Sequence, residues 1–230
     1  MKPAPKGRAR YPKQTDNSEE TLLVNETYKA LDGEGPWQGF PVVIVRLMGC
    51  NLRCSYCDSK FAYYEGERTT LSALVKKISS YRIKKVLVTG GEPLAQRGTP
   101  FLLEKLLKLK FEVSLETNGS YPIEPVPEGV VKIVDVKTPG SGSGEFFAEG
   151  NLRLLGKGDC LKLVICSRGD YEWSKKFLAK HKKICCDIVF SPAWSEVSPP
   201  ELAGWMLDDG LDVRFAVQLH KILWGDVRGV

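Results

Sequence analysis

The chain of 230 residues has no apolar run that approaches the roughly 18 residues needed to cross a bilayer. Its N-terminus is basic but lacks the apolar stretch of a secretory signal. We therefore expect neither a membrane protein nor an exported one, and a cytoplasmic location. In that compartment cysteines act more often as ligands or free thiols than as disulfides.

The body of the chain also lacks an excess of positive charge. The formal net charge is +5, and an acid-free N-terminal stretch accounts for all of it: Lys2, Lys6, Arg8, Arg10 and Lys13. A neutral body has no electrostatic footprint for nucleic acid, so no such partner is expected. We predict that residues 1–20, which are polar and Pro-rich, form a disordered basic tail, and that residues 21–230 form a single domain.

Past the tail, β-rich runs alternate with segments of helical periodicity. Strands are predicted at 21–30, 41–49, 84–90, 111–119, 130–137, 160–166, 186–194 and 212–221. Helices are predicted at 70–81, 99–110, 171–183 and 198–210, the last with Ser198 as its N-cap. This alternation indicates βα units, and the predicted fold class is α/β with a mostly parallel sheet.

Nearly every unusual polar or glycine-rich cluster directly follows a predicted strand. The clusters are GCNLRC, TGGEP, ETNGS, DVKTPGSGSG, SPAW and QLHK. Ligands of barrels and open α/β sheets bind at the carboxyl ends of the strands. We therefore expect one site assembled from six loops. The two glycines of TGGEP are expected to let the backbone approach a ligand closely.

Three of the seven cysteines, Cys50, Cys54 and Cys57, form a C-x3-C-x2-C pattern. A structural zinc site needs four ligands, usually in paired C-x2-C units, and both histidines, His181 and His220, lie far away in sequence. An iron–sulfur cluster is usually held by thiolates, and three of them leave one iron of a cubane open to a substrate or cofactor. The spacing favours the cluster, with zinc or unligated thiols as the alternatives.

The C-x3-C-x2-C pattern with Tyr56 before the last cysteine resembles the signature of the radical S-adenosylmethionine (SAM) superfamily. The resemblance implies a 4Fe-4S cluster whose open iron is chelated by SAM, and cleavage of SAM to a 5′-deoxyadenosyl radical. It also implies a partial, open (β/α) barrel and a flavodoxin or ferredoxin as electron donor. TGGEP resembles the motif that lines the methionine end of SAM, with Glu92 as an organiser of the loop.

The segment TYKALDGEGPWQGFPVVIVRLMGCNLRCSYCDS, together with ETNG, DVKTPGSG and LHK, resembles the 7-carboxy-7-deazaguanine synthase family over roughly residues 24–222. The family resemblance implies that 6-carboxy-5,6,7,8-tetrahydropterin is converted to 7-carboxy-7-deazaguanine with loss of ammonia. SAM would be regenerated, Mg²⁺ would assist, and the chain would form a homodimer. The product would enter 7-deazapurine biosynthesis, such as that of queuosine.

The same resemblance assigns roles to individual residues, with no side chain acting as a catalytic acid or base. Cys50, Cys54 and Cys57 would hold the cluster, and Ser59, where many relatives have Thr, would ligate Mg²⁺. The expected SAM-binding residues are Tyr56, Cys57, Asp58, Gly91, Glu92, Glu116, Asp135, Val136, Lys137, Ser191, Pro192, Ala193 and Trp194. The expected substrate-binding residues are Leu31, Asp32, Gly33, Glu34, Arg46, Thr89 and His220. The Arg46 guanidinium suits the carboxylate of the pterin.

In one respect the chain departs from the pattern of the family. Some relatives end near the LHK segment and cover the substrate with their last residue, whereas this chain continues through ILWGDVRGV to Val230. No residue is assigned to that contact from sequence.

Two other functions are weighed against this one. A glycyl-radical enzyme activase shares the cysteine and GGEP motifs but needs a large protein partner. An iron–sulfur electron carrier normally supplies all of its cluster thiolates and would not cleave SAM.

The cysteine assignment predicts that Cys54→Ala loses both the visible absorption of the reconstituted iron–sulfur protein and all SAM cleavage. Absorption spectra and chromatography of the SAM cleavage products measure the two effects. Full activity of the variant would contradict the assignment.

Overall fold

The computed structural model describes residues 20–194 and 196–230, so the predicted tail, except for Glu20, lies outside the described residues. The strands are β1 (Thr21–Leu31), β2 (Pro41–Leu47), β3 (Glu67–Thr70), β4 (Lys85–Gly90), β5 (Glu112–Thr117), β6 (Val131–Val136), β7 (Cys160–Ile165), β8 (Asp187–Pro192) and β9 (Arg214–Phe215). The α-helices are α1 (Leu71–Ser80), α2 (Thr99–Lys108), α3 (Arg168–Lys180), α4 (Pro199–Asp208) and α5 (Leu219–Trp224).

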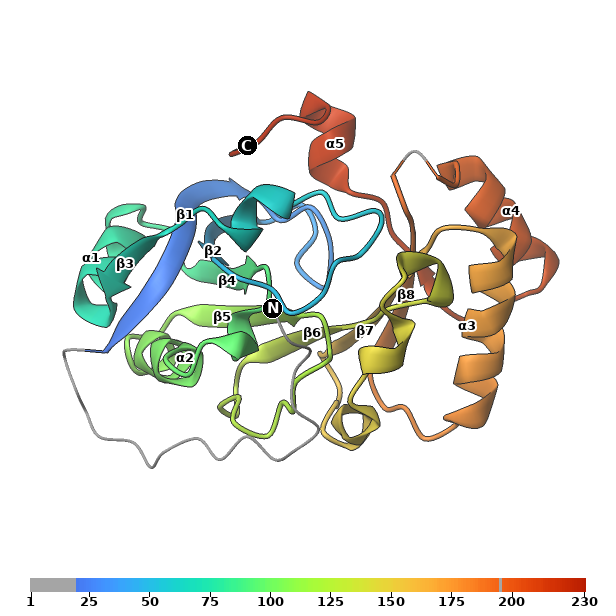
Figure 1. The fold of residues 1–230 in the computed structure, drawn as a ribbon, viewed down its shortest axis with the longest axis horizontal. Helices are drawn as coiled ribbons and strands as arrows, with labels where there is room; N and C mark the ends of the chain where they lie inside the picture. The colour runs from blue at the N-terminus through green and yellow to red at the C-terminus, as the bar shows by residue number, and fades with distance from the viewer. Residues whose placement is uncertain (1–19, 195) are drawn as a thin grey trace.

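The strands form one nine-stranded sheet in the order β3-β1-β2-β4-β5-β6-β7-β8-β9. β1 pairs antiparallel with both β2 and β3, whereas every pair from β2 to β9 is parallel. The sheet is therefore open and mostly parallel, as the sequence predicts (Figure 1). Because seven parallel strands share one direction, their carboxyl ends and the loops that follow meet at one edge.

The two faces of the sheet have different neighbours. Along β2, Val43, Val45 and Leu47 belong to the large core that also contains the buried residues of α1, α2 and α4. Val42 and Ile44 point to the opposite face and join a smaller cluster. This alternation follows from the period of two along a strand. Helices α1 to α4 contact strands of the sheet, whereas α5 lies apart from them, at the top of Figure 1.

Local signals explain where the helices begin. The side chains of Thr70, Ser167 and Ser198 each accept a hydrogen bond from a backbone N–H in the first turn of α1, α3 and α4, respectively. These caps satisfy donors that the helix itself leaves free. The predicted N-cap at Ser198 is confirmed.

The prediction of a strand at 212–221 is wrong beyond its first few residues. Only Arg214 and Phe215 pair with β8, and residues 219–224 form α5. Ala216 N–H still donates to the Phe190 carbonyl, but the next bond of a parallel ladder would need an N–H from Pro192, which has none. The ladder therefore stops there, and the chain turns away. The short strand β3 has no counterpart in the sequence prediction.

Among the described residues, no helix combines the length and apolarity that a membrane span requires.

Gly90 ends β4 opposite Leu47 of β2 and has φ 148°, a backbone conformation that favours glycine. A Cβ at this position would lie 2.2 Å from the Leu47 carbonyl oxygen, which cannot move without disturbing the sheet. We expect Gly90→Ala to lower the free energy of unfolding by about 3 kcal/mol or more. Urea denaturation measures this. The matched control is Gly204→Ala in α4, where a Cβ meets no atom within 4 Å; an equal loss there would contradict the steric explanation.

Candidate active site

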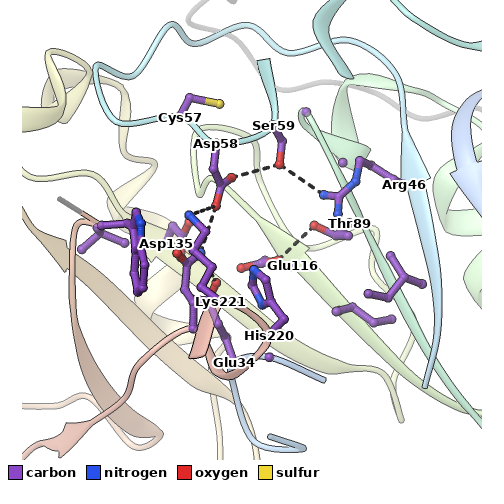
Figure 2. A pocket seen from close by; sticks show the side chains of 18 of the residues that line it. Glu34, Arg46, Cys57, Asp58, Ser59, Thr89, Glu116, Asp135, His220 and Lys221 are labelled. Atoms are coloured by element: carbon purple, nitrogen blue, oxygen red, sulfur yellow. Dashed lines mark hydrogen bonds and ion pairs between the residues drawn. The ribbon is translucent and has the colours of Figure 1, made fainter. Parts of the chain in front are cut away.

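A cavity of about 450 Å³ lies at the carboxyl edge of the sheet. Residues from all six polar clusters line it, so the structure brings the six loops together around one cavity. Figure 2 shows the cavity with Cys57, Asp58 and Ser59 on one side and His220 and Glu34 on the other. A volume of this size is typical of a small-molecule site.

Nearly all of the residues assigned from sequence line this cavity. They are Leu31, Asp32, Gly33, Glu34, Arg46, Cys50, Cys54, Tyr56, Cys57, Asp58, Ser59, Thr89, Gly91, Glu116, Asp135, Lys137, Ser191, Pro192, Ala193, Trp194 and His220. Glu92 and Val136 do not line it; both are buried, and Val136 belongs to the large core.

The three cysteines of the pattern are free thiols around the same cavity. The Cys50 sulfur accepts from the Leu52 N–H at 3.4 Å and lies 3.7 Å from Asn118 Nδ2. Burial raises the pKa of both Cys50 and Cys54. Within residues 20–194 and 196–230, no three His, Cys, Asp or Glu side chains are close enough to bind a single ion as they stand.

In an iron–sulfur cluster each thiolate binds a different iron, so the three cysteines need not converge on one ion. Three free thiols on one loop, with two polar N–H groups directed at the sulfur of Cys50, supply the soft ligands and the hydrogen bonds that such a cluster takes. The residues present therefore fit the group that the sequence pattern implies.

The glycines of TGGEP let the backbone after β4 approach the cysteine loop, the segment 48–66 between β2 and β3. A Cβ at Gly91 would lie 2.2 Å from the Gly49 carbonyl oxygen and 2.9 Å from Cys50 Cβ. The backbone of the second loop is thus pressed against the first, beside the cavity.

Glu92 organises these loops from behind the cavity. Its carboxylate accepts from Leu94 N–H at 2.8 Å, from Thr117 Oγ1 at 2.8 Å and from Asn118 N–H at 2.7 Å. Burial raises the pKa of Glu92 to about 7, against the lowering effect of these bonds. Its structure fits the organising role that the sequence indicates.

Arg46 projects from β2 into the side of the cavity. Its Nε lies 2.7 Å from Glu26 Oε1 and its Nη2 lies 3.2 Å from the Tyr28 hydroxyl. Its Nη1 lies 3.4 Å from Ser59 Oγ, a contact drawn in Figure 2. Burial lowers the pKa of this guanidinium, but the contacts with Tyr28 and Glu26 outweigh that effect and raise it. The group is therefore a fixed positive charge.

The floor of the cavity holds a buried ammonium group, that of Lys162 on β7. Its Nζ lies 2.5 Å from Glu116 Oε1, 2.9 Å from Glu34 Oε2 and 3.5 Å from Asp135 Oδ1. Burial lowers the pKa of Lys162, yet the three carboxylates hold it well above its ordinary value. Lys162 thereby holds three acids from three different segments close together.

The chain beyond β9 closes one side of the cavity. Gln218 Nε2 lies 2.9 Å from both Glu34 Oε1 and Asp58 Oδ2. Lys221 Nζ, whose side chain is 5% exposed, lies 3.3 Å from Asp58 Oδ2. The Gln218 contacts join the cysteine loop to the DGEG segment, residues 32–35.

Sequence reasoning missed Lys162, Gln218 and Lys221 as members of the site. Lys162 had a usable signal, since a single lysine inside the apolar strand CLKLVIC needs a buried partner. Gln218 and Lys221 lie in the QLHK cluster that the sequence places at the site, but only His220 of that cluster was assigned a role, because the turn into α5 that aims the other two side chains was not expected.

Comparison with known proteins finds relatives that cover most of the chain. Residues 44–134 match the radical SAM superfamily. The chain is 39% identical over 222 residues to the 7-carboxy-7-deazaguanine synthase of Koribacter versatilis, which covers 88% of this chain and 97% of that protein. It is 38% identical over 219 residues to the synthase of the same name from Chlorobaculum tepidum, covering 93% of this chain and 100% of that protein.

The chain belongs to the 7-carboxy-7-deazaguanine synthase family. The crystal structure of QueE from Escherichia coli has the same fold, with a TM-score of 0.71 and 20% identity over 86% of this chain and 94% of that one. The cofactors of this radical SAM family are a 4Fe-4S cluster and SAM.

The buried carboxyl group of Asp32 makes the stability of the folded chain depend on pH. Its side chain is 2% exposed and Oδ2 has no hydrogen-bond partner, and burial raises its pKa from 3.8 to about 7. The folded chain thus binds this proton more tightly than the unfolded chain, so the contribution of Asp32 to stability is complete below pH 4 and is lost as the pH rises to about 7.

Between pH 5 and pH 8, the stability of the wild type relative to Asp32→Asn is expected to fall by on the order of 2 kcal/mol. Urea denaturation of both chains at the two pH values measures this difference, in which other titrating groups cancel. A difference that stays constant or rises with pH would show that Asp32 is not protonated in the folded chain.

Proposed function

We propose that this chain converts 6-carboxy-5,6,7,8-tetrahydropterin to 7-carboxy-7-deazaguanine with release of ammonia, using SAM catalytically. The observation that carries the proposal is that one cavity contains both the three thiols of the cysteine loop and the guanidinium of Arg46, whose side chain is 16% exposed. The first group suits an iron–sulfur cluster and the second suits a carboxylate-bearing substrate.

Cys50, Cys54 and Cys57 would hold the cluster, which together with SAM supplies a 5′-deoxyadenosyl radical when bound. The loops that follow β4, β6 and β8 would then bind SAM. Trp194 is 44% exposed beside the cavity. Lys137 Nζ lies 2.6 Å from Asp135 Oδ2, and this ion pair holds the ammonium and the carboxylate at the same wall of the cavity.

Substrate would lie on the side of Arg46, Thr89 and the DGEG segment. A Cβ at Gly33 would lie only 2.2 Å from His220 Nδ1, so the absence of a side chain there lets the imidazole pack on the backbone. Thr89 Oγ1 lies 3.0 Å from Glu116 Oε2, which directs both groups toward the same volume (Figure 2). These groups would orient the pterin and exclude water from it.

Mg²⁺ would bind near Ser59. The Ser59 hydroxyl lies 3.0 Å from Asp58 Oδ1, so two hard oxygen ligands of the kind that Mg²⁺ prefers are side by side. A serine supplies the same hydroxyl as the threonine of many relatives.

The remaining expectations also belong to this proposal. The electron would come from a flavodoxin or ferredoxin, the chain would form a homodimer, and the reaction would take place in the cytoplasm. The small-molecule substrate needs no nucleic acid or membrane as partner.

The test is a mass-spectrometric assay of anaerobically reconstituted protein with SAM, Mg²⁺, a reductant and the carboxylated pterin. We expect a product lighter than the substrate by one ammonia, with SAM not consumed stoichiometrically. Cleavage of SAM without conversion of the pterin would instead support the activase, and failure to cleave SAM would support the electron carrier.

A further inference from the structure

Two residues beside Arg46, Glu26 on β1 and Arg228 near the end of the chain, have no role in the proposed function. Glu26 faces Arg46 across the antiparallel β1–β2 pair. Its two oxygens bind different guanidinium groups: Oε1 lies 2.7 Å from Arg46 Nε and Oε2 lies 2.9 Å from Arg228 Nε. Glu26, which is 15% exposed, therefore connects the two arginines.

On the side that faces the cavity, Glu26 orients the Arg46 guanidinium. Of the five N–H donors of a guanidinium, three are engaged by Glu26, Tyr28 and Ser59. The remaining two, both on the Nη atoms, have no hydrogen-bond partner within the described part of the chain and would bind a carboxylate in the cavity. Without Glu26 the plane of the guanidinium would lose the strongest of the contacts that orient it.

On the outer side, Arg228 holds the C-terminal segment against β1 and the cysteine loop. Its Nη1 lies 3.0 Å from Glu65 Oε2 and its Nη2 lies 3.2 Å from Asn25 Oδ1. Its Cζ lies 3.8 Å from the centroid of the Phe61 ring. Because residues 226–230 line the cavity, this set of contacts holds them across one side of it.

The Arg228 contacts are weak enough for the C-terminal segment, residues 225–230, to open and close over the cavity. The side chain is 45% exposed, and ion pairs at such positions are individually weak. Lys221, whose side chain is 5% exposed, lies 3.3 Å from Asp58, which holds α5, and 3.9 Å from Asp226 at the start of the segment. Release of Arg228 would therefore free the last residues while α5 stays in place, with Asp226 held only by the longer of these two contacts.

The charges of Glu26 and Arg228 link closing of the C-terminal segment to binding of the ligand. Arg46 and Glu26 together carry no net charge, and Arg228 on the outer oxygen of Glu26 draws that negative charge away from Arg46. The acid of the same segment, Asp226, lies 3.9 Å from Lys221 Nζ, which offsets its charge. A carboxylate in the cavity and Arg228 on Glu26 therefore favour each other, and the coupling is reciprocal.

We propose that Glu26 is a positioning residue that orients Arg46 and, through Arg228, couples closing of the C-terminal segment (residues 225–230) to binding of the substrate carboxylate. The proposal rests on the proposed function only in taking the ligand to be a carboxylated pterin.

The experiment compares the wild-type holoenzyme with Arg228→Met and Glu26→Gln. Calorimetry measures the dissociation constants of 6-carboxytetrahydropterin and of tetrahydropterin, which lacks the carboxylate. We expect Arg228→Met to weaken binding of the first by at least about fivefold and to leave binding of the second unchanged. Glu26→Gln should reduce the same discrimination and raise KM more than it lowers kcat, because the orientation of Arg46 is what it changes.

Hydrogen exchange gives a readout that is independent of turnover. In the wild type the carboxylated pterin should slow amide exchange in residues 225–230 more than tetrahydropterin does, and in Arg228→Met this difference should disappear. Arg228→Lys, which keeps the charge but not the planar fork, should restore part of it.

Arg168→Met is the matched control, since Arg168 is 50% exposed, pairs with Glu172 and lies over an aromatic ring away from the cavity. Unchanged discrimination in Arg228→Met, or an equal loss in Arg168→Met, would overturn the inference while leaving the proposed function intact. A wild type that binds neither pterin would overturn the proposed function itself.

Discussion

The parallel alignment of the strands from β2 to β9 is the constraint on which the rest of the structure depends. One face of each strand must bury apolar side chains against the helices, and Val43, Val45 and Leu47 of β2 do so. The carboxyl ends then meet at one edge, where short loops hold the polar residues together. The cavity is a consequence of this alignment, because segments far apart in sequence end at the same edge.

A site of this kind gathers charge in a poorly solvated place, which is unfavourable unless the charges are paired. Lys162 pairs with Glu34, Glu116 and Asp135, and Glu92 satisfies three donors of neighbouring loops. The glycines of TGGEP are part of the same packing, since they admit the cysteine loop at van der Waals distance. Binding groups and structural groups are thus held by one continuous set of contacts.

Most of the fold could be predicted from sequence, because strand and helix periodicities are local. The strands β2, β4, β5, β6, β7 and β8 were all expected, as was the cap at Ser198. The misplaced strand at 212–221 shows the limit of that reasoning: its pattern suits a strand, but its partner offers Pro192 where the ladder needs an N–H. Whether such a segment forms a strand depends on the strand it pairs with, and the local sequence pattern does not show that partner.

By itself, the sequence determined the cysteine pattern, the glycines, the Arg46 position on a strand and the order of the loops around the site, since each depends on residue type and short-range spacing. Only the tertiary structure decided which residues from the end of the chain complete the cavity. Gln218 meets Glu34 across 184 residues, and Arg228 meets Glu26 across 202. Contacts at such separations depend on how the sheet brings β1 and the chain after β9 together, and no periodicity within either segment encodes that distance.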